Sequence, residues 1–229
     1  MARMPRTAFD RITGTVYRML VAELAFLAAV APGILGMLFL QPHPSNIPLY
    51  ALCLVPLGPA LAAVIGTFRA LDGSHDLVVW PRFWRAWWRD LRDVLLVWVP
   101  ALVVLTVLAI NVAFAAAAGV DPIFAVIAIV LAAVVGVLTL HALVIAAVFS
   151  FRTRDVARLA LMYLVAKPLA SVGALAVLIV VATAAATGFA WLIALAGSLL
   201  GVFLLANSRA MVADITARFT DEPNPRLAE

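Results

Sequence analysis

Long runs of hydrophobic residues, divided by short polar segments, dominate this sequence. A helix needs about 20 apolar residues to cross a bilayer, and four of the runs have that length. A further run, 169–206, is too long for one helix, and Thr187-Gly188 offers a turn that divides it. The pattern therefore predicts an all-α integral membrane protein with six transmembrane helices, at about 17–40, 49–71, 94–118, 122–149, 169–186 and 189–210.

The basic residues divide the predicted loops into two classes. All 16 Lys and Arg residues lie around the start of the first helix, between the second and third, between the fourth and fifth, or from the end of the sixth onward. The loops on the other side, 41–48, Asp121 and the turn at Gly188, contain none. Because cytoplasmic loops carry an excess of Lys and Arg, we predict that both termini are cytoplasmic.

Composition excludes the commoner alternatives. The chain of 229 residues is 66% hydrophobic and 12% charged, whereas a soluble domain is about half apolar and about a quarter charged. One cysteine, Cys53, allows no internal disulfide and no cysteine metal cluster. Arginine greatly outnumbers the single lysine, which favours a GC-rich bacterial source. We therefore expect one polytopic domain over 1–229 in the bacterial cytoplasmic membrane, with a flexible tail at 219–229.

The segment 80–93 is the most distinctive polar stretch. At about 100° per residue, its aromatic side chains share one face of a helix and its arginines the other. Such a helix suits the headgroup layer of a membrane, and the same side chains also suit contact with a protein partner. Both interpretations are kept. The residues expected at this lipid or partner interface are Phe83, Trp84, Arg85, Trp87, Trp88 and Arg89.

A second amphipathic helix is predicted at 153–166, between the fourth and fifth spans. Val156, Leu159, Tyr163 and Leu164 recur at helical spacing and form an apolar stripe. Lys167-Pro168 ends the helix before the next span. Both amphipathic helices are expected on the cytoplasmic side.

Prolines interrupt the first two predicted spans at a similar depth. Pro32 lies in the first span, and Pro56 and Pro59 lie in the second. Proline frees backbone groups, which persist in lipid only where protein or water satisfies them. Paired breaks can form a substrate or ion site, and prolines can equally be packing kinks.

Few polar side chains lie within the predicted spans. Glu23 is the one acidic residue well inside a span, which makes it a functional candidate by default. Arg69 or Arg209 could instead neutralise it as part of the structure. His141, Asn111 and Asn207 are more typical of hydrogen bonds between helices.

The sequence lacks the motifs of an enzyme. No G-x-S-x-G, H-E-x-x-H or phosphate-binding glycine loop is present. The predicted topology separates the three histidines, so they cannot converge on one metal. We expect no catalytic residues, no metal, no cofactor and no nucleic-acid partner, only the lipid bilayer and protein partners.

Five short motifs follow one another along the first half of the chain: Glu23-Leu-Ala-Phe26, Ala31-Pro-Gly33, Gly58-Pro-Ala-Leu-Ala-Ala63, Thr67-Phe-Arg69 and Phe83-Trp-Arg-Ala-Trp-Trp-Arg89. In this order they resemble the YesL-like family of bacterial membrane proteins, which has no established biochemical function. The resemblance is best over about 15–100. It departs from the family pattern at Glu23, where asparagine is typical, and at Phe26, where tryptophan is.

Members of that family are often associated with ATP-powered (ABC) sugar importers. The resemblance therefore implies a non-enzymatic accessory subunit whose partners are ABC permease and ATPase subunits, with self-association left open. The alternative is a self-sufficient transporter or channel for a small solute, which uses Glu23 and the helix breaks at Pro32 and Pro56.

Overall fold

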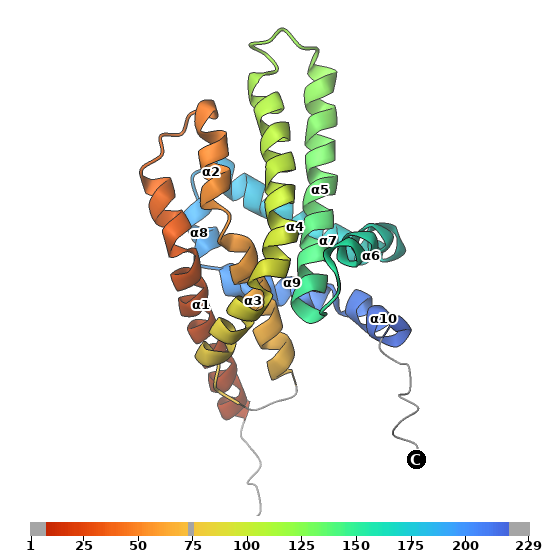
Figure 1. The fold of residues 1–229 in the computed structure, drawn as a ribbon. Helices are drawn as coiled ribbons and strands as arrows, with labels where there is room; N and C mark the ends of the chain where they lie inside the picture. The colour runs from red at the N-terminus through yellow and green to blue at the C-terminus, as the bar shows by residue number, and fades with distance from the viewer. Residues whose placement is uncertain (1–7, 73–75, 220–229) are drawn as a thin grey trace, which may run out of the picture.

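The computed structural model describes residues 8–72 and 76–219, and every regular element in these ranges is helical. Five helical segments are long and apolar enough to cross a bilayer, and a bent pair of helices near the end of the chain makes up to six. The prediction of an all-helical chain with several candidate membrane spans is confirmed. The elements, shown in Figure 1, are α1 (Ala8–Leu38), η1 (Pro44–Asn46), α2 (Ile47–Cys53), α3 (Leu57–Leu71), α4 (Trp80–Phe114), α5 (Pro122–Val148), α6 (Thr153–Ala166), α7 (Pro168–Ala186), α8 (Ala190–Ala194), α9 (Gly197–Asn207) and α10 (Arg209–Phe219).

Helix α3 forms the centre of the molecule. Every residue from Gly58 to Ile65 is buried, and α1, α4, α5 and α9 all pack against it. Three alanines, Ala60, Ala62 and Ala63, leave almost no exposed surface. Small side chains allow close approach of neighbouring helices, which is how helices associate where lipid removes the hydrophobic drive.

Helices α4 and α5 form a long antiparallel pair whose upper ends rise above the rest of the molecule (Figure 1). The two halves of α5 differ sharply. Between residues 122 and 135 only Ala128 is buried, whereas between 136 and 147 only Leu138 is not. Half of this hairpin is therefore part of the core, and its outer half presents an apolar surface to its surroundings.

The predicted boundary at 93/94 is wrong. The segment 80–93 and the span predicted at 94–118 are one continuous helix, α4, of 35 residues. Residues 82–99 contain no proline or glycine that would break the helix near Asp93. Pro81 stands in the first turn, where proline is tolerated because its missing N–H would have no partner.

The last span is not the single helix predicted at 189–210. Gly188 makes the predicted turn with a φ of 81°, but α8, α9 and α10 follow as separate helices, and α9 and α10 meet at 52°. Glycine and serine are weak helix formers, and they stand at both junctions, as Gly197-Ser198 and Ser208. With only 11 residues, α9 is too short to cross a bilayer alone.

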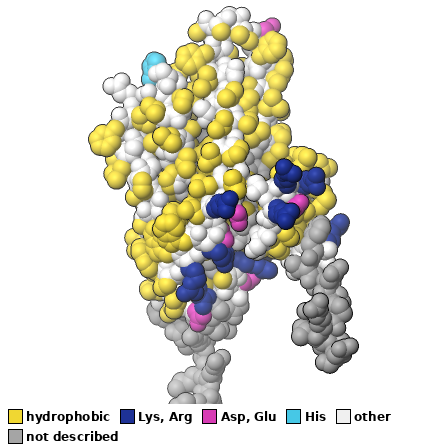
Figure 2. Space-filling model, in the orientation of Figure 1, with side chains coloured by type: hydrophobic (Ala, Val, Ile, Leu, Met, Phe, Trp, Pro, Cys, Tyr) yellow, Lys and Arg dark blue, Asp and Glu magenta, His cyan; other side chains and the backbone are white. Residues whose placement is uncertain are grey.

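The helix expected at 153–166 coincides with α6, and Val156, Ala160 and Tyr163 are its buried residues. The start of α1 and the end of α10 lie at the same end of the molecule (Figure 1). On the face drawn in Figure 2, Lys and Arg gather in the lower half, and hydrophobic side chains cover the upper half. The predicted flexible tail, 219–229, lies outside the described residues except for Phe219.

Candidate functional site

The first break in a predicted span occurs at Pro56, as expected. Helix α2 ends at Cys53, and Pro56 stands at the N-cap of α3. The indole N–H of Trp98, on α4, donates a hydrogen bond of 3.0 Å to the carbonyl oxygen of Leu54 in the gap. The Trp98 ring packs so closely over Gly58 that a Cβ there would overlap it. One side chain therefore fills the break and adds a second hydrogen bond to the Leu54 carbonyl, which also accepts the backbone N–H of Leu57 at 3.1 Å.

Pro32, in contrast, lies inside the unbroken helix α1, so the expected pair of breaks at Pro32 and Pro56 does not form. The residue after this proline, Gly33, is where α1 packs against the end of α2. A Cβ at Gly33 would overlap the backbone carbonyl of Cys53, which shows how closely α1 approaches the end of α2. Pro59 lies in the first turn of α3 and is buried.

The second break separates α8 from α9, and Glu23 completes it. The Glu23 carboxylate accepts hydrogen bonds from the backbone N–H of Gly197 at 3.2 Å and of Ser198 at 2.8 Å. It also accepts one from the Ser198 hydroxyl at 2.6 Å. The residue at the α9 N-cap, Ala196, provides no side-chain hydrogen bond.

A carboxylate at a helix N-terminus is favourable because it satisfies free N–H groups and faces the positive end of the helix dipole. Glu23 therefore acts as the N-cap of α9, supplied from α1. The expectation that Arg69 or Arg209 neutralises it is wrong, since Arg69 pairs instead with Asp72 and the Glu23 oxygens bind the start of α9.

The two breaks border one cavity of about 690 Å³. Leu54, Leu57 and Trp98 line it from the first break, and Ala194 and Gly197 line it from the second. The other lining residues are Phe26, Val30, Ile34, Met37, Pro42, His43, Pro44, Ile47, Tyr50, Cys53, Leu61, Leu140, Val177, Leu178, Val181, Ala185, Ile193, Leu200 and Leu204. The lining is overwhelmingly apolar, and the hydroxyl of Tyr50 is already donated to the carbonyl of Leu40 at 3.1 Å. This composition suits an apolar ligand better than a sugar or an ion.

The aromatic face of 80–93 is divided between core and surface. Phe83 is fully buried, so it does not lie at a lipid or partner surface as expected, whereas Trp88 is 67% exposed. Trp84 and Trp87 are intermediate in exposure. Their rings make an edge-to-face contact with centroids 5.7 Å apart, and similar contacts join Trp84 to Phe83 and Trp87 to Trp88.

The arginines of the same segment lie on the outside. Arg85 and Arg89 are exposed, and Arg89 forms two hydrogen bonds of 2.7 Å with the carboxylate of Asp90. The exposed part of the predicted interface therefore combines Trp88 with Arg85 and Arg89.

The remaining predicted polar residues take structural positions. Asn207 joins two helices, as expected, by donating a hydrogen bond of 2.8 Å to the carbonyl of Ala170. Asn111 instead bonds the carbonyl of Val107 in its own helix. His141 is 1% exposed, and neither ring nitrogen has a hydrogen-bond partner among the described residues. It does not line the cavity between the breaks.

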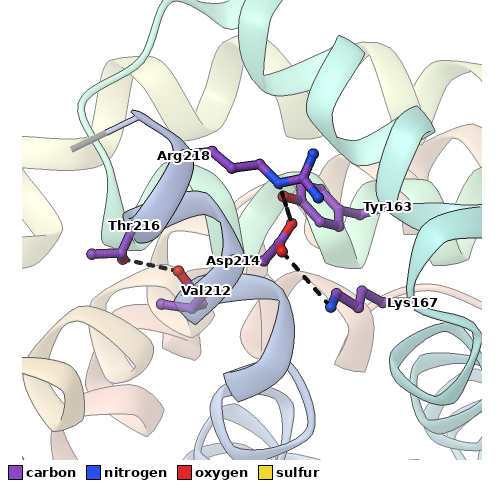
Figure 3. Close-up of polar contacts among 6 residues, drawn as sticks. All are labelled: Tyr163, Lys167, Val212, Asp214, Thr216 and Arg218. Carbon is purple, nitrogen blue, oxygen red and sulfur yellow. Dashed lines mark hydrogen bonds and ion pairs between the residues drawn. The ribbon is translucent and has the colours of Figure 1, made fainter. Parts of the chain in front are cut away.

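Asp214 was missed by sequence reasoning. Its carboxylate accepts a hydrogen bond of 2.5 Å from the Tyr163 hydroxyl and lies 3.0 Å from Arg218 and 3.9 Å from Lys167 (Figure 3). Burial and this hydrogen bond raise the pKa of Tyr163 to about 12. The cluster fastens α10 to α6 and to the residue that joins α6 to α7.

Residues 19–112 match the model of a protein family described as of unknown function, DUF624. The match extends from α1 nearly to the end of α4, and it contains Glu23, Pro56, Pro59 and Trp98. It includes most of the region, about 15–100, that resembles the YesL-like family. No curated protein and no solved structure matches the chain.

Proposed function

We propose that this protein is a non-enzymatic accessory subunit of a membrane complex and acts through helix–helix contacts. The observation that carries the proposal is the outer half of the α4–α5 hairpin. Phe124, Val126, Ile127 and Ile129 are each about half exposed, although they point in different directions around α5. A helix that meets its own protein on so few sides is suited to insertion beside the helices of a neighbour.

The expected neighbours are the permease and ATPase subunits of an ABC-type carbohydrate importer. This part of the proposal rests on the resemblance to the YesL-like family. The proposed orientation places both termini in the cytoplasm, and it is supported by the clustering of Lys and Arg at one end of the molecule (Figure 2). In that orientation Trp88, Arg85 and Arg89 lie near the cytoplasmic headgroups, where they can contact an ATPase subunit.

Site-specific photo-crosslinking tests this contact. A crosslinking residue at Ile129, 56% exposed on α5, should capture a permease subunit in the native membrane, because it lies on the outer hairpin. The same residue at Leu20, 60% exposed on α1, is the matched control. Capture of lipid alone from Ile129, or the same captured proteins from both positions, contradicts the proposal.

A second candidate function is the transport of a small solute by this protein alone. The cavity between two broken helices favours it, because transporter sites often lie where helices are interrupted. The apolar lining indicates an apolar solute. Reconstitution of the purified protein alone into liposomes distinguishes the two functions: a transporter should carry an apolar solute across the bilayer, whereas an accessory subunit should add no flux to that of protein-free liposomes.

A further inference from the structure

A second cavity, of about 470 Å³, lies between α1, α3, α9 and α10. It differs from the apolar cavity in its charge, because three of its lining residues are arginines, one each from α1, α3 and α10: Arg18, Arg69 and Arg209. Among the described residues of the lining, Asp72 is the only acidic one. Its carboxylate lies 3.8 Å from the Arg69 guanidinium, and both side chains are substantially exposed. Basic residues therefore outnumber acidic ones in the described lining, which favours a bound anion.

The fold brings these arginines together through features already described. Glu23 holds α1 against the start of α9, and Arg18 and Met19, just over one turn earlier on α1, line the cavity. At the other end of α9 the chain bends by 52°, which places Arg209, the first residue of α10, in the lining. The cavity therefore depends on the bend and on the Glu23 cap.

The remaining lining is mostly apolar, with Phe68, Leu71, Val202, Leu205 and Val212 among its residues. An apolar wall lowers the local polarity and strengthens the attraction between fixed charges and a bound anion. Guanidinium groups present planar pairs of donors that match the oxygens of phosphate. A phosphate has enough oxygens to engage several arginines at once, whereas a single carboxylate has two.

We infer that this cavity binds a phosphate group. Two sources carry that chemistry at a membrane surface, the headgroup of an anionic phospholipid and a free phosphate anion. A basic pocket between transmembrane helices is a recognised form of site for the former. Neither the accessory function nor the transport function is required for this inference, so it stands or falls separately from them.

Binding is tested by the thermal unfolding of the full chain in a neutral detergent, because a ligand of the folded state raises the midpoint. The probes are inorganic phosphate against chloride at equal ionic strength, and dihexanoyl phosphatidylglycerol against dihexanoyl phosphatidylcholine. A rise with inorganic phosphate identifies the free anion as sufficient. A rise with phosphatidylglycerol alone identifies a lipid headgroup, and either result supports the site.

The double variant Arg69→Gln with Arg209→Gln should need at least about tenfold more probe for the same rise, because each charged hydrogen bond contributes on the order of 1.4 kcal/mol or more, equal to tenfold in affinity. Both side chains are exposed, so the fold should tolerate the change, and Arg209→Gln alone serves if it does not. The control, Arg154→Gln with Arg158→Gln, removes two exposed arginines of α6 outside the cavity. The inference is overturned if neither probe raises the midpoint or if the two double variants respond alike.

Discussion

Glu23 and Ser198 stand 175 positions apart in the chain, yet one carboxylate oxygen of Glu23 accepts both the backbone N–H and the hydroxyl of Ser198, at 2.8 and 2.6 Å. The contact closes the end of a helix that is broken within the bundle. It also fixes α1 to α9, and these two helices contribute walls to both cavities. Glu23 therefore has a structural role, as the residue of α1 that caps α9.

Replacing Glu23 should destabilise the folded protein. Glu23→Ala leaves the N–H groups of Gly197 and Ser198 without an acceptor, at a cost of about 2 kcal/mol or more. Glu23→Gln keeps one acceptor oxygen and should cost less. The measurement is thermal unfolding in detergent, with Asp93→Asn, which alters an exposed carboxylate on α4, as the control. Equal midpoints for Glu23→Ala and Asp93→Asn would contradict the capping role.

Trp98→Phe should reveal the importance of the bond across the first break. The variant retains an aromatic ring over Gly58 but loses the donor to the Leu54 carbonyl. The Leu54 carbonyl still accepts the backbone N–H of Leu57 at 3.1 Å, so we expect a loss of about 0.5–1.5 kcal/mol, typical of one hydrogen bond removed. Trp88→Phe, at a 67% exposed position, should change the unfolding midpoint little. A larger effect at Trp88 than at Trp98 would refute this interpretation.

Two glycines of α1 should respond to alanine in opposite ways. At Gly33 a Cβ would overlap the carbonyl of Cys53, and overpacking of this kind costs about 1–3 kcal/mol. At Gly14 the nearest atom to a Cβ is a Leu77 methyl carbon at 3.8 Å, so Gly14→Ala should stabilise the helix by up to about 1 kcal/mol. Unfolding midpoints of the two variants in the same detergent check the prediction, and a tolerant Gly33→Ala would show that α1 and α2 are not tightly packed.

Stability should fall at high pH through Tyr163. Its pKa is raised from 10.0 to about 12 by burial and by the hydrogen bond to Asp214, so the folded state holds the proton more tightly than the unfolded state. This contribution is complete below pH 10 and is lost as the pH rises through about 12. Tyr163→Phe should remove this part of the pH dependence, and the difference in ultraviolet absorbance between the two proteins should show one tyrosine that titrates near pH 12. Identical stability profiles above pH 10 would contradict the assignment.

The helical class and most helix positions follow from the sequence because hydrophobic length and proline act locally. The second span breaks at Pro56 for this reason, and α6 begins and ends where its stripe and Lys167-Pro168 indicate. The partner of Glu23 could not be found this way. It binds backbone N–H groups, which every residue except proline possesses, and the run Ala196-Gly197-Ser198 gives only a faint sign of a helix start.

The segment 80–93 shows a different limit. Helical periodicity identifies an aromatic face, but an aromatic side chain is favourable both in a protein core and in the headgroup layer. Phe83 became core and Trp88 became surface, a division that depends on where α3 and α1 pack. Trp98 gave no signal at all, because its role depends on a carbonyl in another helix.

The accessory function is tested most directly by isolating the tagged protein from its native membrane in mild detergent and identifying what accompanies it by mass spectrometry. The account predicts stoichiometric recovery of permease and ATPase subunits of one ABC importer. It also predicts that bulky substitutions on the outer half of α5, such as Ile129→Trp, reduce this recovery, whereas Leu20→Trp does not. Recovery of the protein alone, or only with further copies of itself, would contradict the account.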